Sequence, residues 1–381
     1  MQRFEAIRSY RDDEIPAAMQ RIANDAAIHN ILDYFDLGCD TEQFREVLCH
    51  IETIDGFQRQ IVRPMVEAII RRTTNGLSVT GMDCLDPEGH YLLVSNHRDI
   101  VLDAMLLAYA FLQHGLPLFN IAFGSNLVFN SLANDFAKSN RMFEMDRGGT
   151  KMEFYNKLAL SSEYIRHLAV QQHESVWIAQ RNGRTKDGID ATDPALVKML
   201  GMSRRDDRVA ALAELDIVPV AVSYEWESCD KLKTIELYLT KKNGHYEKQP
   251  NEDLNSVITG IRQPKGRVRI HVGERLSEAD LVALNDCNSG EFYRRVAQVM
   301  DDRINRGYAL FPNNYIAHDL RSGTTRFADR YTPEQKAEFE DYLRWLDKYK
   351  ELEINMLNSI FLGIYANPVD SFLKVLESRH G

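Results

Sequence analysis

The sequence predicts an α/β protein in which a central mixed sheet is covered by helices and flanked by helical segments on both sides. Short apolar runs such as YLLVSNH, SVWIAQ and IVPVAVSYE alternate with helical patterns between residues 77 and 278. This alternation is typical of a sheet whose strands are joined by helices. The chain has 381 residues, which is enough for one large domain or two closely packed ones.

Residues 1–76 are predicted to form a helical N-terminal flank. In DTEQFREVLCHIETIDGFQRQIVRPMVEAIIRRTTNG, apolar residues recur three and four positions apart, and Asn75-Gly76 is a plausible stop. Residues 77–278 follow as the α/β domain. Residues 279–381 read as a helical C-terminal extension, in which the Thr-Pro of YTPEQKAEFEDYLRWL can cap and open a helix. Because no low-complexity linker separates these segments, we expect the flanks to pack onto the central layer.

Composition and charge argue against several classes of protein. The formal net charge of −10 is unfavourable for general nucleic-acid binding, which relies on an excess of cations facing the phosphates. No run approaches the roughly 20 apolar residues of a membrane-spanning helix, and the first residues lack the apolar core of a secretory signal. The five widely spaced cysteines do not suggest a disulfide framework or a zinc site. These features predict a protein of the reducing cytoplasm.

The stretch VSNHRDIVLDAMLL carries the first candidate site. It places His97 in a turn between a predicted buried strand and a predicted helix, where open α/β sheets usually place their chemistry. Two carboxylates follow, Asp99 and Asp103. From these residues alone, two interpretations stay open. His97 is a base with a carboxylate partner, or Asp99 caps the helix and His97 is an incidental loop residue.

Three further stretches follow in the order seen in one family. RMFEMDRGG is a short strand ending in Arg147, WIAQRNGRTKDG places Gly183, Arg184 and Thr185 after a strand, and IVPVAVSYE is a buried strand that carries Pro219. Together with the histidine turn, they resemble the blocks of the glycerol-3-phosphate and 1-acylglycerol-3-phosphate acyltransferases. The resemblance covers about residues 80–278 and neither helical flank.

The resemblance implies roles for the residues of the histidine turn. His97 would be the general base that takes a proton from an alcohol, since an imidazole with an ordinary pKa of about 6.5 suits this task near neutral pH. We favour Asp103 as the carboxylate that orients the ring, because an apolar helix continues from it as in the family. Asp99 is then left as the helix cap.

The resemblance also implies an acceptor that carries a phosphate. Arg147 and Arg184 are the candidates to bind it, because a guanidinium offers a planar fork of donors to phosphate oxygens. Thr185 and the backbone N–H of Gly183 would assist them. Lys186 is either a further phosphate contact or a solvated loop charge.

Three positions depart from the family pattern. Five residues rather than four separate His97 from Asp103, so the two side chains can meet only if the histidine lies on a turn before the helix. Residues 180–182 (QRN) replace the glutamate that usually precedes the glycine. Arg141 stands where a glycine is expected.

The implied activity is transfer of a fatty acyl group from acyl-CoA or acyl carrier protein to a hydroxyl of glycerol 3-phosphate or 1-acylglycerol 3-phosphate, without a cofactor. Because the product enters a bilayer, we expect a peripheral protein on the inner face of the cell membrane. Amphipathic stretches in the first 75 residues or in LNSIFLGIYANPVDSFLKVL could supply the contact, although helices packed in the core would show the same pattern.

Two other classes of function stay open. His97, Asp99 and Asp103 could bind a divalent cation in a metal-dependent hydrolase, because His and Asp side chains at a strand end can be metal ligands. The missing glutamate allows a non-catalytic relative that binds lipid or acyl carrier protein. Chelator sensitivity would distinguish the first class, and turnover that depends on His97 would exclude the second.

Overall fold

The computed structural model describes residues 2–35, 38–127, 130–146, 148–349 and 351–377. Within this part of the chain, seven strands form one sheet in the order β1-β7-β6-β2-β5-β3-β4, and the β6–β7 pair alone is antiparallel. The strands are β1 (Thr74–Thr80), β2 (Leu92–Ser95), β3 (Asn120–Gly124), β4 (Met142–Met145), β5 (Val176–Ala179), β6 (Ile217–Tyr224) and β7 (Gly266–Val272). This mixed sheet, surrounded by helices, confirms the predicted α/β class.

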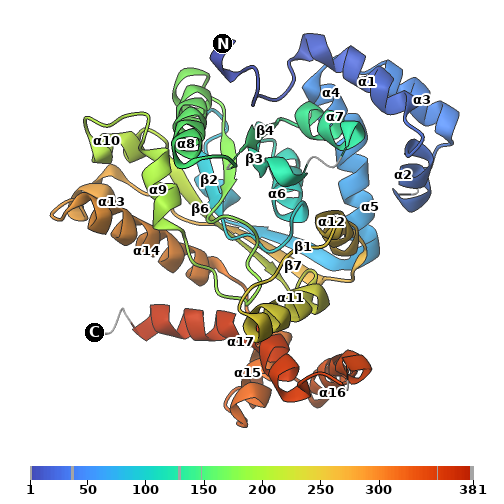
Figure 1. Ribbon diagram of the computed structural model, residues 1–381, viewed down its shortest axis with the longest axis vertical. Helices are drawn as coiled ribbons and strands as arrows, with labels where there is room; N and C mark the ends of the chain where they lie inside the picture. The colour runs from blue at the N-terminus through green and yellow to red at the C-terminus, as the bar shows by residue number, and fades with distance from the viewer. Residues whose placement is uncertain (1, 36–37, 128–129, 147, 350, 378–381) are drawn as a thin grey trace.

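Helices connect the strands of the central region and cover both faces of the sheet (Figure 1). They are α6 (Leu102–Gln113), α7 (Ser131–Ser139), α8 (Lys151–Arg166), α9 (Pro194–Leu200), α10 (Arg208–Ala213), α11 (Asp230–Asn243) and α12 (Glu252–Arg262). Successive side chains of β2 point to opposite faces, as the pleat requires. Leu93 therefore packs in the core with the N-terminal helices and α6, whereas Leu92 and Val94 pack with α8, α9 and the later helices.

The N-terminal flank is helical up to the first strand. Its helices are α1 (Ile15–Asn24), α2 (Ile28–Phe35), α3 (Thr41–Cys49), α4 (Ile54–Phe57) and α5 (Arg63–Thr73). The last of them ends at Thr73, and the predicted stop at Asn75-Gly76 lies inside β1. Gly76 has a φ of +114°, and the pairing register with β7 shifts between Thr74 and Leu77. The Asn-Gly pair therefore forms an irregularity in an edge strand instead of ending a helix.

The N-terminal segment also covers the far edge of the sheet. β4 is the edge strand next to β3, and the backbone N–H of Glu144 in β4 donates to the carbonyl of Ile7 at 2.8 Å. The N–H of Tyr10 donates to the carbonyl of Lys138 at 3.1 Å. The chain before α1 thus pairs with a strand that would otherwise present a free donor.

The C-terminal region is helical. It comprises α13 (Glu278–Ala283), α14 (Ser289–Gly307), α15 (Pro312–Ser322), α16 (Pro333–Leu343) and α17 (Ile354–Glu377). The predicted Thr-Pro start is present, because Thr332 Oγ1 accepts from the Gln335 N–H and α16 begins at Pro333. Figure 1 shows α15, α16 and α17 together at the end of the molecule opposite α1 and α3. Of these, α17 contacts α11 as well as α15, so the extension reaches the central region.

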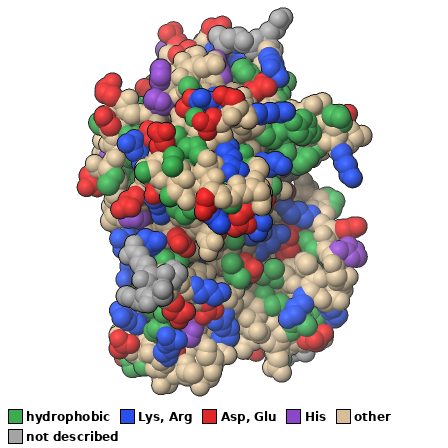
Figure 2. Space-filling view, turned by 90° about the vertical axis from the view of Figure 1, so that its left-hand side faces the viewer, with side chains coloured by type: hydrophobic (Ala, Val, Ile, Leu, Met, Phe, Trp, Pro, Cys, Tyr) green, Lys and Arg blue, Asp and Glu red, His purple; other side chains and the backbone are tan. Residues whose placement is uncertain are grey.

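The described helices and one face of the surface bear on membrane and nucleic-acid binding. None of the described helices combines the length and apolar composition needed to cross a membrane. On the face shown in Figure 2, acidic and basic side chains are interspersed. This face therefore lacks the continuous basic surface typical of nucleic-acid binding.

Candidate active site

The turn after β2 brings His97 and Asp103 together. His97 Nδ1 lies 2.9 Å from Asp103 Oδ2, and the aspartate is buried in the first turn of α6. The same carboxylate oxygen accepts the backbone N–H groups of Arg98 and Asp99 at 2.7 and 2.9 Å. Side chains six positions apart do not meet along a helix. The turn curls around the carboxylate and makes the contact possible despite the five-residue spacing.

Asp99 has a different position in the same turn. Its Oδ1 accepts the backbone N–H groups of Val101 and Leu102, both at 2.9 Å, which are free donors at the start of α6. Its Oδ2 accepts a hydrogen bond from Ser228. The structure therefore separates the two aspartates into one that caps the helix and one that contacts the imidazole.

Tyr224 holds the other oxygen of Asp103. Its hydroxyl donates to Asp103 Oδ1 at 2.8 Å from the last residue of β6, the neighbour of β2 in the sheet. Burial, together with the adjacent Asp103 carboxylate, raises the pKa of Tyr224 well above its ordinary value. The phenol therefore stays a neutral donor, and both oxygens of Asp103 are fixed in place.

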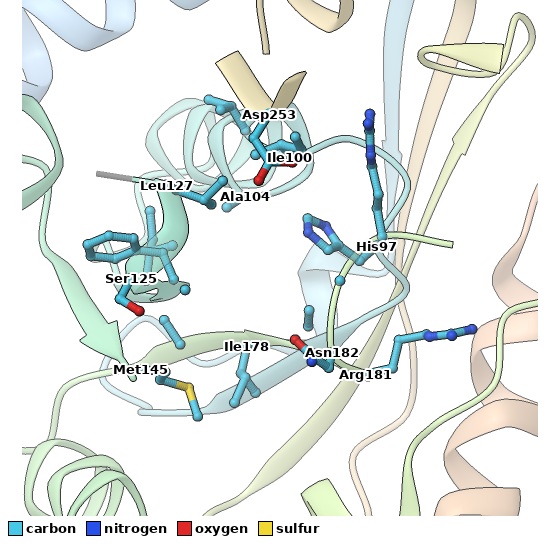
Figure 3. Close-up of a pocket in the computed structure, with 18 of the residues that line it drawn as sticks. His97, Ile100, Ala104, Ser125, Leu127, Met145, Ile178, Arg181, Asn182 and Asp253 are labelled. Atoms are coloured by element: carbon cyan, nitrogen blue, oxygen red, sulfur yellow. The ribbon is translucent and has the colours of Figure 1, made fainter. Parts of the chain in front are cut away.

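The imidazole faces a pocket of about 670 Å³. Figure 3 shows the ring directed into a space bounded by Ile100 and Ala104 on one side and by Met145 and Ile178 on the other. Because Nδ1 contacts the carboxylate, Nε2 is the ring nitrogen left to meet a molecule in this pocket. The His97 ring also lies edge-on to Trp177, which limits its rotation.

The pocket has an apolar part and a polar part. The apolar part comes mainly from α6, β3, β4 and β5, and its residues include Ile100, Met105, Phe123, Met142, Met145 and Ile178. The polar part comes mainly from the segment after β5; its residues include Arg181, Asn182, Gly183, Arg184, Lys186 and Lys248, together with the acidic Asp187 and Asp253, of which Asp253 pairs with Lys248. This division suits an amphiphilic ligand with an alkyl chain and an anionic end.

Residues 76–223 match the model of the protein family described as Acyltransferase. This stretch, less than half of the chain, is therefore similar to an acyltransferase domain. A search among curated proteins found no match. Among solved structures, the 1-acyl-sn-glycerophosphate acyltransferase PlsC from Thermotoga maritima is similar at a TM-score of 0.37 and 11% sequence identity, covering 75% of this chain and 91% of that chain. The domain contains the histidine turn and the segment after β5, whereas β7 and the C-terminal helices lie outside the matched residues.

Arg184 is a candidate phosphate ligand of the pocket. One guanidinium nitrogen, Nη2, donates to Ser256 Oγ at 2.7 Å, while Nη1 is buried and has no hydrogen-bond partner among the described residues. A buried donor without a partner is costly, and the residue as a whole lines the pocket. Gly183 lines the pocket beside it with a φ of +68°.

The other residues predicted to bind substrate have different surroundings. The Thr185 hydroxyl is buried and donates to Asp190 Oδ1 at 2.9 Å, and its backbone N–H donates to the carbonyl of His97 at 2.6 Å. Lys186 lines the pocket and forms an ion pair with Glu236. Through its two bonds, Thr185 supports the histidine turn instead of facing the pocket as a phosphate ligand.

Arg147, the remaining residue predicted to bind the phosphate, lies outside the described residues.

The three departures from the family pattern have physical consequences. Arg141 adopts a φ of +56°, the left-handed region that glycine enters most easily, which accounts for a glycine in the family pattern. Its Nε donates to Gln58 Oε1 at 3.2 Å in the N-terminal flank, and its Nη1 lies 3.9 Å from Glu174 Oε2 before β5. In the segment that lacks the glutamate, Arg181 and Asn182 line the pocket. The pocket is therefore more basic there than the family pattern implies.

A buried network that sequence reasoning missed supports the candidate site. Asp190 Oδ2 accepts from Asn96 Nδ2 at 2.9 Å and from Arg98 Nη2 at 2.6 Å. Burial disfavours the charge of Arg98, but the carboxylates of Asp190 and Glu227 outweigh it and hold the arginine pKa above its ordinary value. The network ties the histidine turn to the segment after β5. The sequence signal was weak, because one arginine and one aspartate stand 92 positions apart.

The described residues contain no group of three or more His, Cys, Asp or Glu side chains placed to hold a metal ion. For the alternative set of His97, Asp99 and Asp103, the reason is visible in the turn. Asp99 directs one oxygen to the helix N-terminus and the other to Ser228, away from the His97–Asp103 contact.

Proposed function

We propose that this acyltransferase moves a fatty acyl group from a thioester to a hydroxyl of a phosphorylated glycerol, either glycerol 3-phosphate or 1-acylglycerol 3-phosphate. The observation that carries the proposal is the His97–Asp103 contact at the boundary between the apolar and the basic parts of one pocket. The alkyl chain fits the apolar part. The phosphate fits the polar part, which includes Arg184.

The chemistry needs no covalent acyl-enzyme. As the acceptor oxygen attacks the thioester carbonyl carbon, its proton passes to Nε2 of His97 and a C–O bond forms. The tetrahedral intermediate then expels the thiolate by breaking the C–S bond, and the imidazolium returns the proton to sulfur. Asp103 holds the ring orientation and stabilises the imidazolium while it exists. Acyl-CoA and acyl carrier protein both present the required thioester.

The function is tested with purified protein and a radiolabelled acyl thioester, supplied as acyl-CoA or as acyl carrier protein. The acceptors are glycerol 3-phosphate, 1-acylglycerol 3-phosphate, and the matching alcohols without phosphate. We expect ester formation with a phosphorylated acceptor, unchanged by EDTA. Hydrolysis that EDTA abolishes would favour the metal-dependent alternative, and donor binding without turnover would favour the non-catalytic one.

Arg184→Lys is expected to weaken acceptor binding. Lysine keeps the charge but loses the planar fork, and one charge-assisted hydrogen bond contributes about 1.5–3 kcal/mol. The KM of the phosphorylated acceptor should therefore rise by about 10- to 100-fold, while the KM of the acyl donor stays unchanged. The measurement compares the two KM values in wild type and variant. An equal effect on phosphorylated and unphosphorylated alcohols would show that Arg184 does not recognise the phosphate.

We also propose that the protein is peripheral on the inner face of the cell membrane and contacts it through the start of α8. The C-terminal stretch considered from the sequence packs most of its large apolar side chains inward, among them Leu357, Phe361 and Tyr365, and exposes Leu376 near its end. In α8, by contrast, Met152, Phe154 and Tyr155 are 69%, 39% and 42% exposed. Gly148, just before this helix, lines the pocket. A membrane at this site would lie beside the pocket.

The double substitution Met152→Ser and Phe154→Ser is expected to reduce sedimentation with anionic phospholipid vesicles. Full burial of such a side chain is worth about 1.5–3 kcal/mol, so partial insertion of two should change the partition coefficient by roughly tenfold or more. Val282→Ser on α13, where the valine is 58% exposed, is the matched control. Equal vesicle binding by the double variant and the control would rule out α8 as the contact.

A further inference from the structure

In helix α17, the backbone carbonyl of Ile364 lacks its usual hydrogen-bond donor. Pro368 lies inside the helix and has no N–H, so the carbonyl of Ile364, four positions earlier, cannot accept the usual helical hydrogen bond. Gly188, in the segment after β5, approaches this carbonyl. A Cβ on Gly188 would lie 2.1 Å from Ile364 O, and the φ of Gly188 is +84°. Both the space and the backbone conformation therefore require glycine at position 188.

Neighbouring side chains of α17 reinforce the contact. Asn367 Nδ2 donates to the carbonyl of Asp187 at 2.8 Å, and its Oδ1 accepts from Arg321 at 2.7 Å. The hydroxyl of Tyr365 accepts the backbone N–H of Glu227 at 3.1 Å. Because Glu227 pairs with Arg98 of the histidine turn, α17 reaches the site by two routes.

The segment that α17 contacts has no regular secondary structure. Between the end of β5 and the start of α9, residues 180–193 form no helix or strand. This segment carries Arg184 in the pocket, Thr185 under the His97 carbonyl, and Asp190 in the buried network. Gly188 stands between Thr185 and Asp190, so displacement at Gly188 would move the groups on both sides of it.

We propose that α17 is a positioning element of the active site, in which the Ile364 carbonyl and Asn367 fix residues 187 and 188 and thereby set the places of Arg184 and His97. The kinetic part of this inference rests on the proposed acyl transfer. The positioning residues lie outside the residues that match the acyltransferase family, so the C-terminal extension supplies a contact that the matched domain lacks.

The test compares Gly188→Ala with Gly363→Ala. Gly363 lies on α17 itself, and a Cβ there would meet only Asn367 Nδ2 at an ordinary 3.7 Å. In Gly188→Ala we expect faster amide hydrogen exchange in peptides covering 95–103 and 181–193, with wild-type exchange in the central strands. For the phosphorylated acceptor, kcat/KM should fall by on the order of tenfold or more, because small misplacements at a reacting centre have large effects on rate. Gly363→Ala should match wild type in both measurements.

Wild-type exchange in both peptides of a folded Gly188→Ala protein would overturn the inference, as would an equal change in Gly363→Ala. If Gly188→Ala does not fold, Asn367→Ala replaces it, since this variant removes the side-chain bond to Asp187 without a steric clash. It should raise exchange in 181–193, and unchanged exchange would again overturn the inference. If wild-type protein transfers no acyl group, the proposed function fails, and the exchange measurements still decide the role of α17.

Discussion

Replacing His97 by alanine is expected to lower kcat for acyl transfer by about 10²- to 10⁴-fold, the usual contribution of general acid–base catalysis. The imidazole is the group that contacts Asp103 through one nitrogen and faces the pocket with its ring. Without it, the attacking hydroxyl must lose its proton to water. The measurement is a steady-state assay with the preferred acyl thioester and acceptor.

His114→Ala serves as the matched control for this experiment. His114 lies at the other end of α6, is exposed, and contacts the Ala110 carbonyl through Nδ1. We expect this variant to keep wild-type kinetics and His97→Ala to keep wild-type affinity for the acyl donor. A His97→Ala enzyme within a few-fold of wild-type turnover would mean that another group removes the proton.

Asp103→Asn is expected to produce the second largest effect, a loss of kcat on the order of 10²- to 10⁴-fold. The carboxylate holds the imidazole in one tautomer and stabilises its protonated form, and an amide can do neither in the same way. Asp103 Oδ2 also accepts two backbone N–H groups, so the fold should lose about 1–3 kcal/mol as these buried donors lose an ionised acceptor. Turnover and the free energy of unfolding are measured on the same preparation.

Asp99→Asn distinguishes the two aspartates of the turn. Asparagine is also a good helix cap, so the contacts to Val101 and Leu102 can persist, and the activity loss should stay within about tenfold. The double variant His97→Ala/Asp103→Asn should have a kcat no lower than that of His97→Ala alone, because the two residues act as one unit. If Asp99→Asn costs more than Asp103→Asn, Asp99 is the functional partner instead.

Local patterns predicted the strands and the histidine turn, because their determinants lie close together in the chain. The buried runs of β2 and β6 were visible as apolar segments, and His97 and Asp103 belong to one short stretch. The order of the strands in the sheet could not be predicted from these local patterns. β1 pairs with β7 about 190 positions later, and this pairing turns the expected Asn75-Gly76 helix stop into part of a strand.

The parts of the site that sequence reasoning missed depend on contacts across the sheet. Tyr224 meets Asp103 because β6 lies beside β2, and no local spacing encodes that neighbourhood. Asp190 joins Asn96 and Arg98 for the same reason. The hydroxyl of Thr185 suggested a phosphate ligand, yet it turns inward because a buried carboxylate lies within its reach. Side-chain direction after an irregular turn is set by its tertiary neighbours.

The bond from Glu144 to Ile7 has a consequence for the behaviour of the whole molecule in concentrated solution. An open sheet grows by recruiting another chain at an unpaired border, and β4 is such a border. The few residues before α1 occupy it from within the same chain. By covering this border, the stretch is expected to reduce aggregation through β4, a role separate from catalysis.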